Sequence, residues 1–148
     1  MNSPTPPADS EFDDVRGTVL CIEDNPLNML IIENLLKRFP GVTVSQAMTG
    51  CEGVRRALAE APDLILLDMN LPDIDGLEVV RQLCDQISTQ HLSVVLVTAD
   101  SFSINVVKAM SLGAREYWVK PLSIDRLRKD LPRALRRAQA GRGRSERG

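Results

Sequence analysis

The stretch LILLDMNLPDIDG, residues 64–76, decides the fold of this chain. Its first four residues are aliphatic and lead to Asp68, which is typical of a buried strand whose carboxyl end carries a polar side chain. The Pro, Asp and Gly residues that follow predict a loop. After Gly76 a helix is predicted, because apolar residues recur there at helical spacing: Leu77, Val80, Leu83 and Ile87.

Similar patterns lie on both sides of this stretch, since short apolar runs alternate with longer runs of helical spacing. The predicted strands are residues 18–22, 42–47, 64–68, 93–98 and 116–119. Strands that are apolar on both faces and are joined by helices form parallel sheets covered on both sides. The sequence therefore predicts a doubly wound α/β fold of five βα units, with a five-stranded parallel sheet and helices on both faces.

Local signals indicate where the helices begin and end. Pro26 after Asn25 predicts the start of the first helix, and Pro40-Gly41 predicts its end. Its expected buried stripe is Leu27, Leu30, Ile31, Leu35 and Leu36. Thr49 and Glu52 have capping-box spacing ahead of the second helix.

The last helix is expected to begin after Ser123, which can cap it, and to carry the apolar residues Ile124, Leu127, Leu131 and Leu135. Pro132 lies inside this pattern, and a proline there removes a backbone hydrogen bond. We therefore expect the helix to kink or restart at that position.

The length of 148 residues favours a single domain, predicted at residues 16–139. Residues 1–15 combine Pro, Ser and acidic residues without periodicity and are expected to be disordered, as is the basic stretch 140–148. Cys21, Cys51 and Cys84 are far apart and form no metal-binding pair, so reduced thiols are expected. No apolar segment is long enough to cross a bilayer and the N-terminus is unlike a secretory signal, so we expect a cytoplasmic protein without membrane contact.

Charge is unevenly distributed along the chain. Residues 1–15 hold four acidic residues and no basic residue before Arg16, whereas from Arg126 onward eight Arg and one Lys face only Asp130 and Glu146. Such a basic region could attract an acidic partner or nucleic acid. A solvated helix face is the favoured interpretation, and nucleic acid is not favoured, because no aromatic residues interleave with the charges.

Polar side chains end the predicted strands on one edge of the sheet. Glu23 and Asp24 follow the first strand and Asp68 ends the third. Thr98 ends the fourth strand and Lys120 follows the fifth. Each residue alone is compatible with an ordinary turn, cap or strand-end role. Because ligands of doubly wound folds bind beyond the carboxyl ends of the strands, the set together predicts a site.

Converging carboxylates repel one another unless a cation lies between them, and oxygen ligands with open positions suit Mg²⁺. A lysine on the opposite side and a threonine hydroxyl add a positive charge and a hydrogen bond for a phosphoryl group. The sequence thus predicts a site for Mg²⁺ and a phosphoryl group.

Four motifs, CIEDN, LILLDMNLPDIDG, LVTAD and YWVKP, resemble those of the response-regulator receiver family of two-component signalling, in this order and over nearly the whole predicted domain. The resemblance implies a CheY-like, or flavodoxin-like, fold. It also implies that Asp68 is the nucleophile that accepts a phosphoryl group from a histidine kinase or a histidine phosphotransfer protein. In this view Asp24, Asp68 and the main-chain carbonyl of Asn70 bind Mg²⁺ directly, Glu23 acts mostly through water, and Lys120 holds a phosphoryl oxygen.

The same resemblance implies a switch pair, Thr98 and Tyr117, whose movement reshapes the last two helices and the fifth strand into a surface for a downstream protein. It further implies that Asn70 and Asp100 tune the lifetime of the phosphorylated state. A small residue, Ala99, fits beside Thr98. Such a chain is a phosphoacceptor switch that catalyses only its own phosphorylation and dephosphorylation, and homodimer formation stays open.

The sequence departs from many members of the family in carrying Glu23 before Asp24, where two aspartates are common. Trp118 is bulky for its place and is expected to pack in the core. Asn25-Pro26 resembles receivers attached to hybrid histidine kinases.

Four alternative functions differ in the residues that they require. A receiver domain of a hybrid kinase and a pseudo-receiver scaffold remain, although the complete acidic site argues against the scaffold. An aspartate-nucleophile phosphatase would need an acid where Asn70 stands. A nucleotide or flavin binder would need a glycine-rich phosphate-binding loop after one of its strands. No such motif follows any of the predicted strands.

Overall fold

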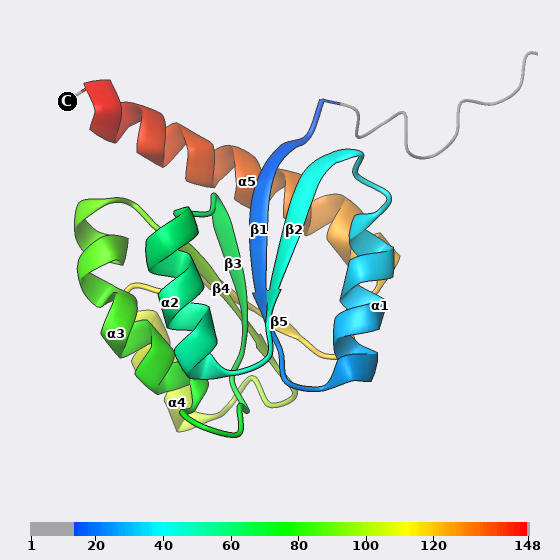
Figure 1. Cartoon of the computed structure of the whole chain (residues 1–148), viewed down its shortest axis with the longest axis vertical. Coiled ribbons are helices and arrows are strands. Elements are labelled where there is room, and N and C mark those ends of the chain that lie inside the picture. The colour runs from blue at the N-terminus through cyan, green and yellow to red at the C-terminus, as the bar shows by residue number, and fades with distance from the viewer. Residues whose placement is uncertain (1–13, 148) are drawn as a thin grey trace, which may run out of the picture.

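The computed structural model describes residues 14–147, with side chains described to residue 141. Within this part the elements alternate strictly (Figure 1). They are β1 (Arg16–Ile22), α1 (Pro26–Leu36), β2 (Gly41–Ala47), α2 (Gly50–Glu60), β3 (Leu64–Asp68), α3 (Gly76–Thr89), β4 (Ser93–Thr98), α4 (Ile104–Ser111), β5 (Glu116–Val119) and α5 (Ile124–Arg147). The predicted bounds of β3, β4 and β5 are confirmed.

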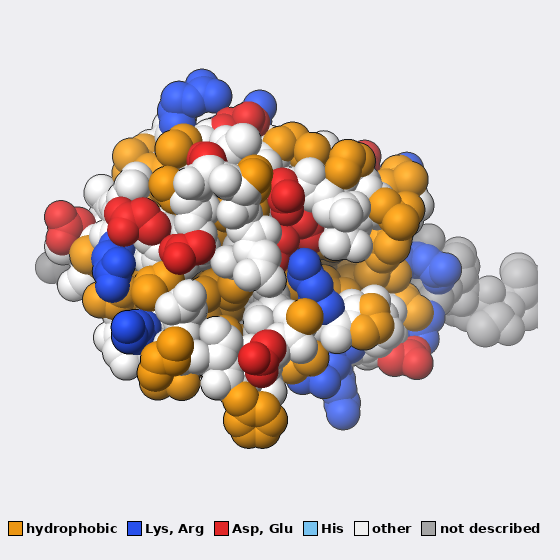
Figure 2. Space-filling model, turned by 90° about the horizontal axis from the view of Figure 1, so that it is seen from below, with side chains coloured by type: hydrophobic (Ala, Val, Ile, Leu, Met, Phe, Trp, Pro, Cys, Tyr) orange, Lys and Arg blue, Asp and Glu red, His pale blue; other side chains and the backbone are white. Residues whose placement is uncertain are grey.

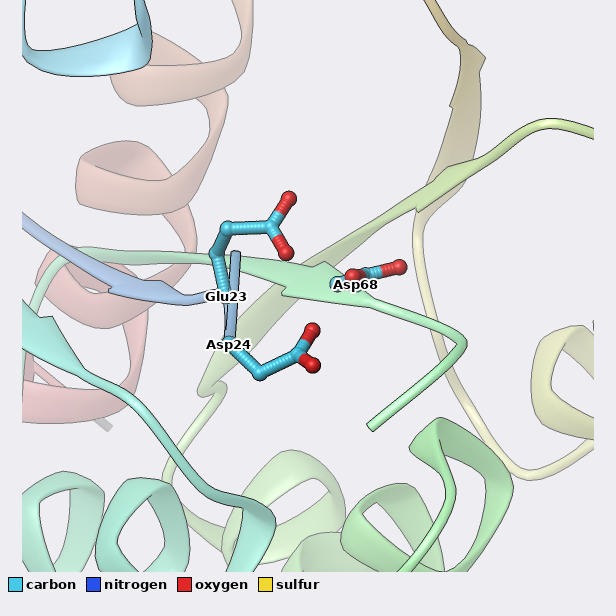
Figure 3. Close-up of side chains that lie close together, drawn as sticks. All are labelled: Glu23, Asp24 and Asp68. Atoms are coloured by element: carbon cyan, nitrogen blue, oxygen red, sulfur yellow. The ribbon is translucent and has the colours of Figure 1, made fainter. Parts of the chain in front are cut away.

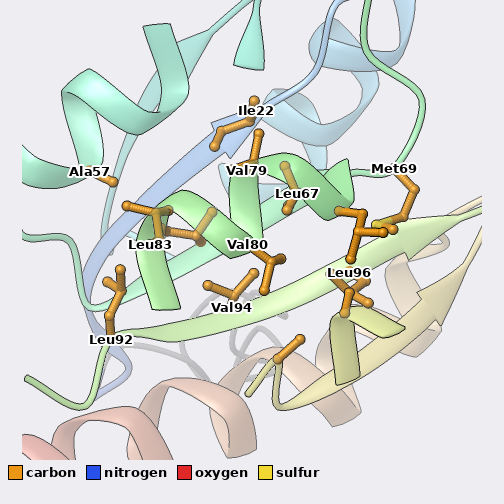
Figure 4. Packing of buried hydrophobic residues seen from close by; sticks show 14 of the residues in the cluster. Ile22, Ala57, Leu67, Met69, Val79, Val80, Leu83, Leu92, Val94 and Leu96 are labelled. Carbon is orange, nitrogen blue, oxygen red and sulfur yellow. The ribbon is translucent and has the colours of Figure 1, made fainter. Parts of the chain in front are cut away.

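The sheet has the strand order β2-β1-β3-β4-β5, and every pairing is parallel. Helices α1 and α5 cover one face, where their buried residues pack with Trp118. Helices α2, α3 and α4 cover the other face, and the core there is almost entirely aliphatic (Figure 4). The predicted doubly wound fold and the core position of Trp118, which is 1% exposed, are thereby confirmed.

The caps of three helices agree with the sequence. The side chain of Asn25 accepts hydrogen bonds from the amides of Leu27 and Asn28 at the start of α1. Thr49 Oγ1 accepts from the amide of Glu52 at 3.1 Å, and Ser123 Oγ accepts from the amide of Arg126 at 3.2 Å. These bonds satisfy amide groups that a helix start leaves without partners.

The predicted buried stripe of α1 is wrong in its first turns. Leu27, Leu30 and Ile31 are 64%, 52% and 43% exposed, and the buried residues of α1 are Met29, Ile32 and Leu36. The periodicity allowed two apolar faces, and the one that meets the sheet is set by packing against β1 and β2. An apolar face of α1 is consequently left on the surface.

Helix α5 does not restart at Pro132, and it extends to Arg147, through most of the stretch that was expected to be disordered (Figure 1). Leu131, Leu135 and Ala138 are at most 1% exposed and continue one apolar face past the proline. Burial of each leucine contributes about 1.5–3 kcal/mol, comparable to the roughly 3 kcal/mol cost of a proline inside a helix. Packing on both sides of Pro132 therefore keeps the helix continuous.

The folded part begins before Arg16, because Val15 is 3% exposed and belongs to the core. Residues 1–13, most of the expected disordered segment, lie outside the described residues. Among the helices described, none combines the length and the apolar character that a membrane span requires. All three cysteines are free thiols, as expected.

Candidate functional site

The carboxyl ends of four strands bring the predicted polar residues to one edge of the sheet. Glu23 and Asp24 follow β1 and Asp68 ends β3, and their carboxylates point toward a common space (Figure 3). Thr98 ends β4, next to β3 in the sheet, and Lys120 follows β5. Figure 2 looks onto this edge and shows acidic side chains near its centre beside a basic one.

Lys120 links two of these carboxylates. Its Nζ lies 3.2 Å from Asp68 Oδ1 and 3.4 Å from Glu23 Oε1. Asp68 and Glu23 are only 4% and 2% exposed, so the ammonium group compensates negative charge that is largely removed from water. The backbone hydrogen bond from the Lys120 amide to Thr98 O, at 2.8 Å, helps to fix the position of this lysine.

Glu23 is a constrained carboxyl group. Burial, together with the hydrogen bond and negative charge of Asp68, raises its pKa to about 7, against the lowering effects of the Asn25 amide and Lys120. The amide of Asn25 donates to Glu23 Oε2 at 3.2 Å. A second positive charge in this space would favour the ionised form of Glu23.

The three carboxylates fit a divalent cation. One oxygen each from Glu23, Asp24 and Asp68 lie within 4.8 Å of one another. All are hard oxygen donors, and Asp24 is half-buried, so water can complete a coordination sphere on that side. This donor set suits Mg²⁺ better than metals that prefer nitrogen or sulfur ligands.

The loop after β3 is held close to Asp68. The amide of Asn70 donates to Asp68 Oδ1 at 3.1 Å, and the amide of Gly76 donates to Met69 O at 3.1 Å. The contact from the Asn70 amide was not predicted, because main-chain contacts of this kind leave no signal in residue types. The predicted roles of Asn70 as a metal ligand and in tuning lifetime stay predictions.

Thr98 is 3% exposed, and its hydroxyl forms hydrogen bonds with the nearby backbone of Asp100. Thr98 Oγ1 donates to Asp100 O and accepts from the Asp100 amide, both at 3.1 Å. Tyr117, its predicted switch partner on β5, is 40% exposed. The structure therefore has the hydroxyl tied to the β4–α4 loop and the aromatic side chain partly in solvent.

An apolar pocket of about 290 Å³ adjoins the site and was not predicted. It lies between α1 and the segment after β5, with Glu23 and Lys120 on its wall beside Ile31, Pro121 and Leu122. The available signal was the surplus of apolar residues in α1, more than one buried face requires.

Comparison with known proteins agrees with this geometry. Residues 19–132 match the family described as response regulator receiver domain. The polar-differentiation response regulator DivK of Brucella ovis is 34% identical over 109 residues, which cover 74% of this chain and 88% of that protein, and DivK of Brucella abortus gives the same values.

Solved structures give the same picture. The receiver domain of a sensor histidine kinase from Pseudomonas aeruginosa, solved with a magnesium ion coordinated in its active site cleft, is 28% identical with a TM-score of 0.72, covering 81% of this chain and 98% of that one. A CheY-like receiver domain protein of Methanospirillum hungatei has a TM-score of 0.76 at 24% identity, covers 85% of this chain and 98% of that one, and supports the fold alone.

Proposed function

The chain belongs to the response regulator receiver domain family, and we propose that it is a phosphoacceptor switch of two-component signalling in which Asp68 receives the phosphoryl group. The observation that carries this proposal is the position of Asp68. Its carboxylate is 4% exposed, lies 3.2 Å from Lys120 Nζ, and shares its space with Glu23 and Asp24.

The proposed reaction is a single transfer. An Asp68 carboxylate oxygen forms a bond to phosphorus as the bond between phosphorus and a histidine nitrogen of the donor breaks, and the released imidazole takes up a proton. Lys120 is close enough to exchange its contact with Asp68 for one with a phosphoryl oxygen. The chain acts as its own catalyst and turns over no separate substrate.

We propose Mg²⁺ as the cofactor, held by Asp24, Asp68 and Asn70, with Glu23 acting through water. When bound, the ion supplies positive charge that offsets the repulsion between the carboxylates and the incoming phosphoryl oxygens. The magnesium in the cleft of the Pseudomonas receiver domain supports this choice. Glu23 then serves to hold Lys120, which it contacts at 3.4 Å.

The proposed phosphodonor is a histidine kinase or a histidine phosphotransfer protein. Helix α1 exposes Leu27, Leu30 and Ile31, and Ile31 also lines the pocket that opens beside Lys120. Together they offer an apolar surface beside the acceptor, and burial of such surface drives protein association. We expect the donor to contact this side of the molecule.

The proposed output is a change in the surface of α4, β5 and α5. A phosphoryl group on Asp68 competes for the hydroxyl of Thr98, which now bonds to the backbone of Asp100. Its movement would leave space for Tyr117 to turn inward, and phosphorylation would shift a population between two arrangements. Exposed apolar side chains supply a surface for a downstream protein there: Phe102, Ile104, Val107, Leu112, Tyr117 and Val119.

Asn70 and Asp100 are proposed to orient water and shorten the phosphorylated lifetime. Both lie in loops that hydrogen bonds tie to the site, through Asp68 and Thr98 respectively. A half-life of many hours for the phosphorylated protein would rule this role out.

Intact mass spectrometry tests the proposed function. The protein is incubated with acetyl phosphate, with and without Mg²⁺, beside Asp68→Asn and the matched variant Asp63→Asn, which lies at the opposite end of β3. We expect one phosphoryl adduct that requires Mg²⁺ and Asp68 and survives in Asp63→Asn. A folded protein that gains no adduct with any donor would favour a pseudo-receiver scaffold instead.

A further inference from the structure

Helix α5 carries a row of basic side chains on the side that faces away from the sheet. With 3.6 residues per turn, five exposed residues fall within an arc of roughly 100°. They are Arg126, Lys129, Arg133, Arg136 and Arg137, and we refer to them as the basic stripe. Buried residues such as Leu131 and Leu135 lie on the opposite side of the helix.

Acidic partners within the domain neutralise only part of the basic stripe. Arg133 contacts Glu116 at 2.8 Å and Asp130 at 3.2 Å, and Arg126 contacts Asp130 at 2.8 Å. Among the described residues, Lys129 and Arg137 form no ion pair. The stripe therefore keeps an excess of positive charge, at Lys129 and Arg137.

The first described residues of the chain, Asp14 to Arg16, lie beside the basic stripe. Gln139 Nε2 donates to Arg16 O at 2.6 Å, and Val15 is buried in the core that α5 shares. Immediately before them, Asp14 Oδ2 lies 3.1 Å from Arg136 Nη2. The first described residue, Asp14, is thus fixed near the C-terminal end of the stripe, where it pairs with Arg136.

The segment that precedes Asp14 matches the stripe in charge and reach. Asp9, Glu11 and Asp13 are acidic, and residues 1–15 contain no basic side chain. Five residues can span up to about 17 Å. Lys129 is seven helical residues from Arg136, or about 10 Å along the axis. The acids can therefore reach the charges that the domain leaves without partners.

We propose that the acidic segment Asp9–Asp14 lies along the basic stripe of α5 and is its partner in the free protein. Individual exposed ion pairs are weak, so the contact needs several of them acting together and weakens with salt. The segment would then cover one side of the proposed output surface and keep other polyanions from α5. This contact does not depend on phosphorylation of Asp68.

Amide chemical shifts of the full chain test the proposal. The wild type is compared with a neutral segment, Asp9→Asn with Glu11→Gln and Asp13→Asn, at low salt and at about 0.5 M NaCl, where the Debye length falls to roughly 4 Å. We expect shift changes along residues 126–140 at low salt, and loss of most of these changes at high salt. A control with Glu52→Gln, Glu60→Gln and Glu78→Gln removes three charges from the other face of the sheet and should leave α5 unchanged.

A reciprocal variant makes the test specific to the stripe. In a background of Lys129→Gln, Arg136→Gln and Arg137→Gln, neutralising the segment should no longer shift the amides of α5. If the neutral segment alters only residues near 9–15, or shifts α5 equally in both backgrounds, the proposal is wrong. The stripe is then left to solvent or to an acidic partner outside the chain.

Discussion

Lys120 Nζ lies 3.2 Å from Asp68 Oδ1, although Asp68 ends β3 and Lys120 follows β5, two strands that are separated in the sheet by β4. Removing the ammonium group leaves Asp68 and Glu23 without their positive partner in a site that is largely closed to water. We expect Lys120→Gln to slow adduct formation from acetyl phosphate about 100-fold, because a positioned charge of this kind is worth that much in a buried site. Lys120→Arg should retain part of the rate, and equal loss in both variants would contradict a role for the charge.

Glu23 should make the metal-free protein less stable as pH rises. Its pKa is raised from 4.5 to about 7 in the folded protein, so the folded state holds this proton more tightly than the unfolded state. The protonated Glu23 carboxyl group therefore contributes its full stabilisation of the fold below about pH 4.5, and this stabilisation is lost as the pH rises through about 7. We expect Glu23→Gln to be more stable than the wild type at pH 8 by about 1–2 kcal/mol, discounted because water reaches one side of the site.

Urea denaturation at pH 4 and pH 8 measures this difference, which should be absent at pH 4. Added Mg²⁺ should narrow the difference at pH 8 by stabilising the ionised wild type. A Glu23→Gln protein that is less stable than the wild type at pH 8 without metal would contradict the electrostatic account of this residue.

Gly76 should tolerate no side chain, because it closes the loop that follows Asp68. A Cβ atom there would lie 2.7 Å from Met69 Cα and 3.0 Å from Asp68 O. We expect Gly76→Ala to cost about 1–3 kcal/mol in the free energy of unfolding, as overpacked sites do. Gly141→Ala is the control, since its Cβ would meet the end of the Arg115 side chain at 3.4 Å and His91 Cβ at 3.8 Å, both ordinary contact distances. That variant should keep or slightly raise stability, because alanine favours a helix.

Asp73 caps α2 from a distant loop. Its carboxylate accepts from the amides of Cys51 and Gly50 at 2.9 and 2.8 Å, and the hydrogen bonds from Cys51 hold its pKa well below the usual range. A group whose pKa is lower in the folded state than in the unfolded state stabilises the fold at pH values above its unfolded-state pKa. This stabilisation is lost as the pH falls through its folded-state pKa. We expect Asp73→Asn to lower the thermal midpoint at pH 7 and this difference to shrink in acid.

Thr49→Ala is the matched control for Asp73, because it removes a cap of the same helix that does not titrate. Its cost should stay nearly constant over the same pH range. A constant cost for Asp73→Asn as well would exclude the proposed linkage.

The residues that the sequence placed in the site are those whose position follows from strand ends alone. Glu23, Asp24, Asp68, Thr98 and Lys120 each end or follow an apolar run, and parallel strands carry such residues to one edge. The apolar pocket beside Lys120 was missed because it depends on the rotation of α1. Periodicity could not choose between the two apolar faces of that helix.

The end of α5 was missed for a related reason. Local propensity favours a break at Pro132 and a frayed basic tail, whereas the buried positions Leu135 and Ala138 continue the helix through tertiary contacts. The hydrogen bond from the Asn70 amide to Asp68 was likewise not predicted, because it depends on backbone geometry that residue types do not encode.

The most direct test of the central claim is to locate the phosphoryl group. The protein is phosphorylated with acetyl phosphate and Mg²⁺ and then reduced with borohydride, which converts an aspartyl phosphate into homoserine, and the reduced residue is identified by peptide mass spectrometry. We expect homoserine at position 68, with Asp24 and Glu23 unchanged. Reduction at another acidic residue, or none in a folded protein that carries an adduct, would contradict it.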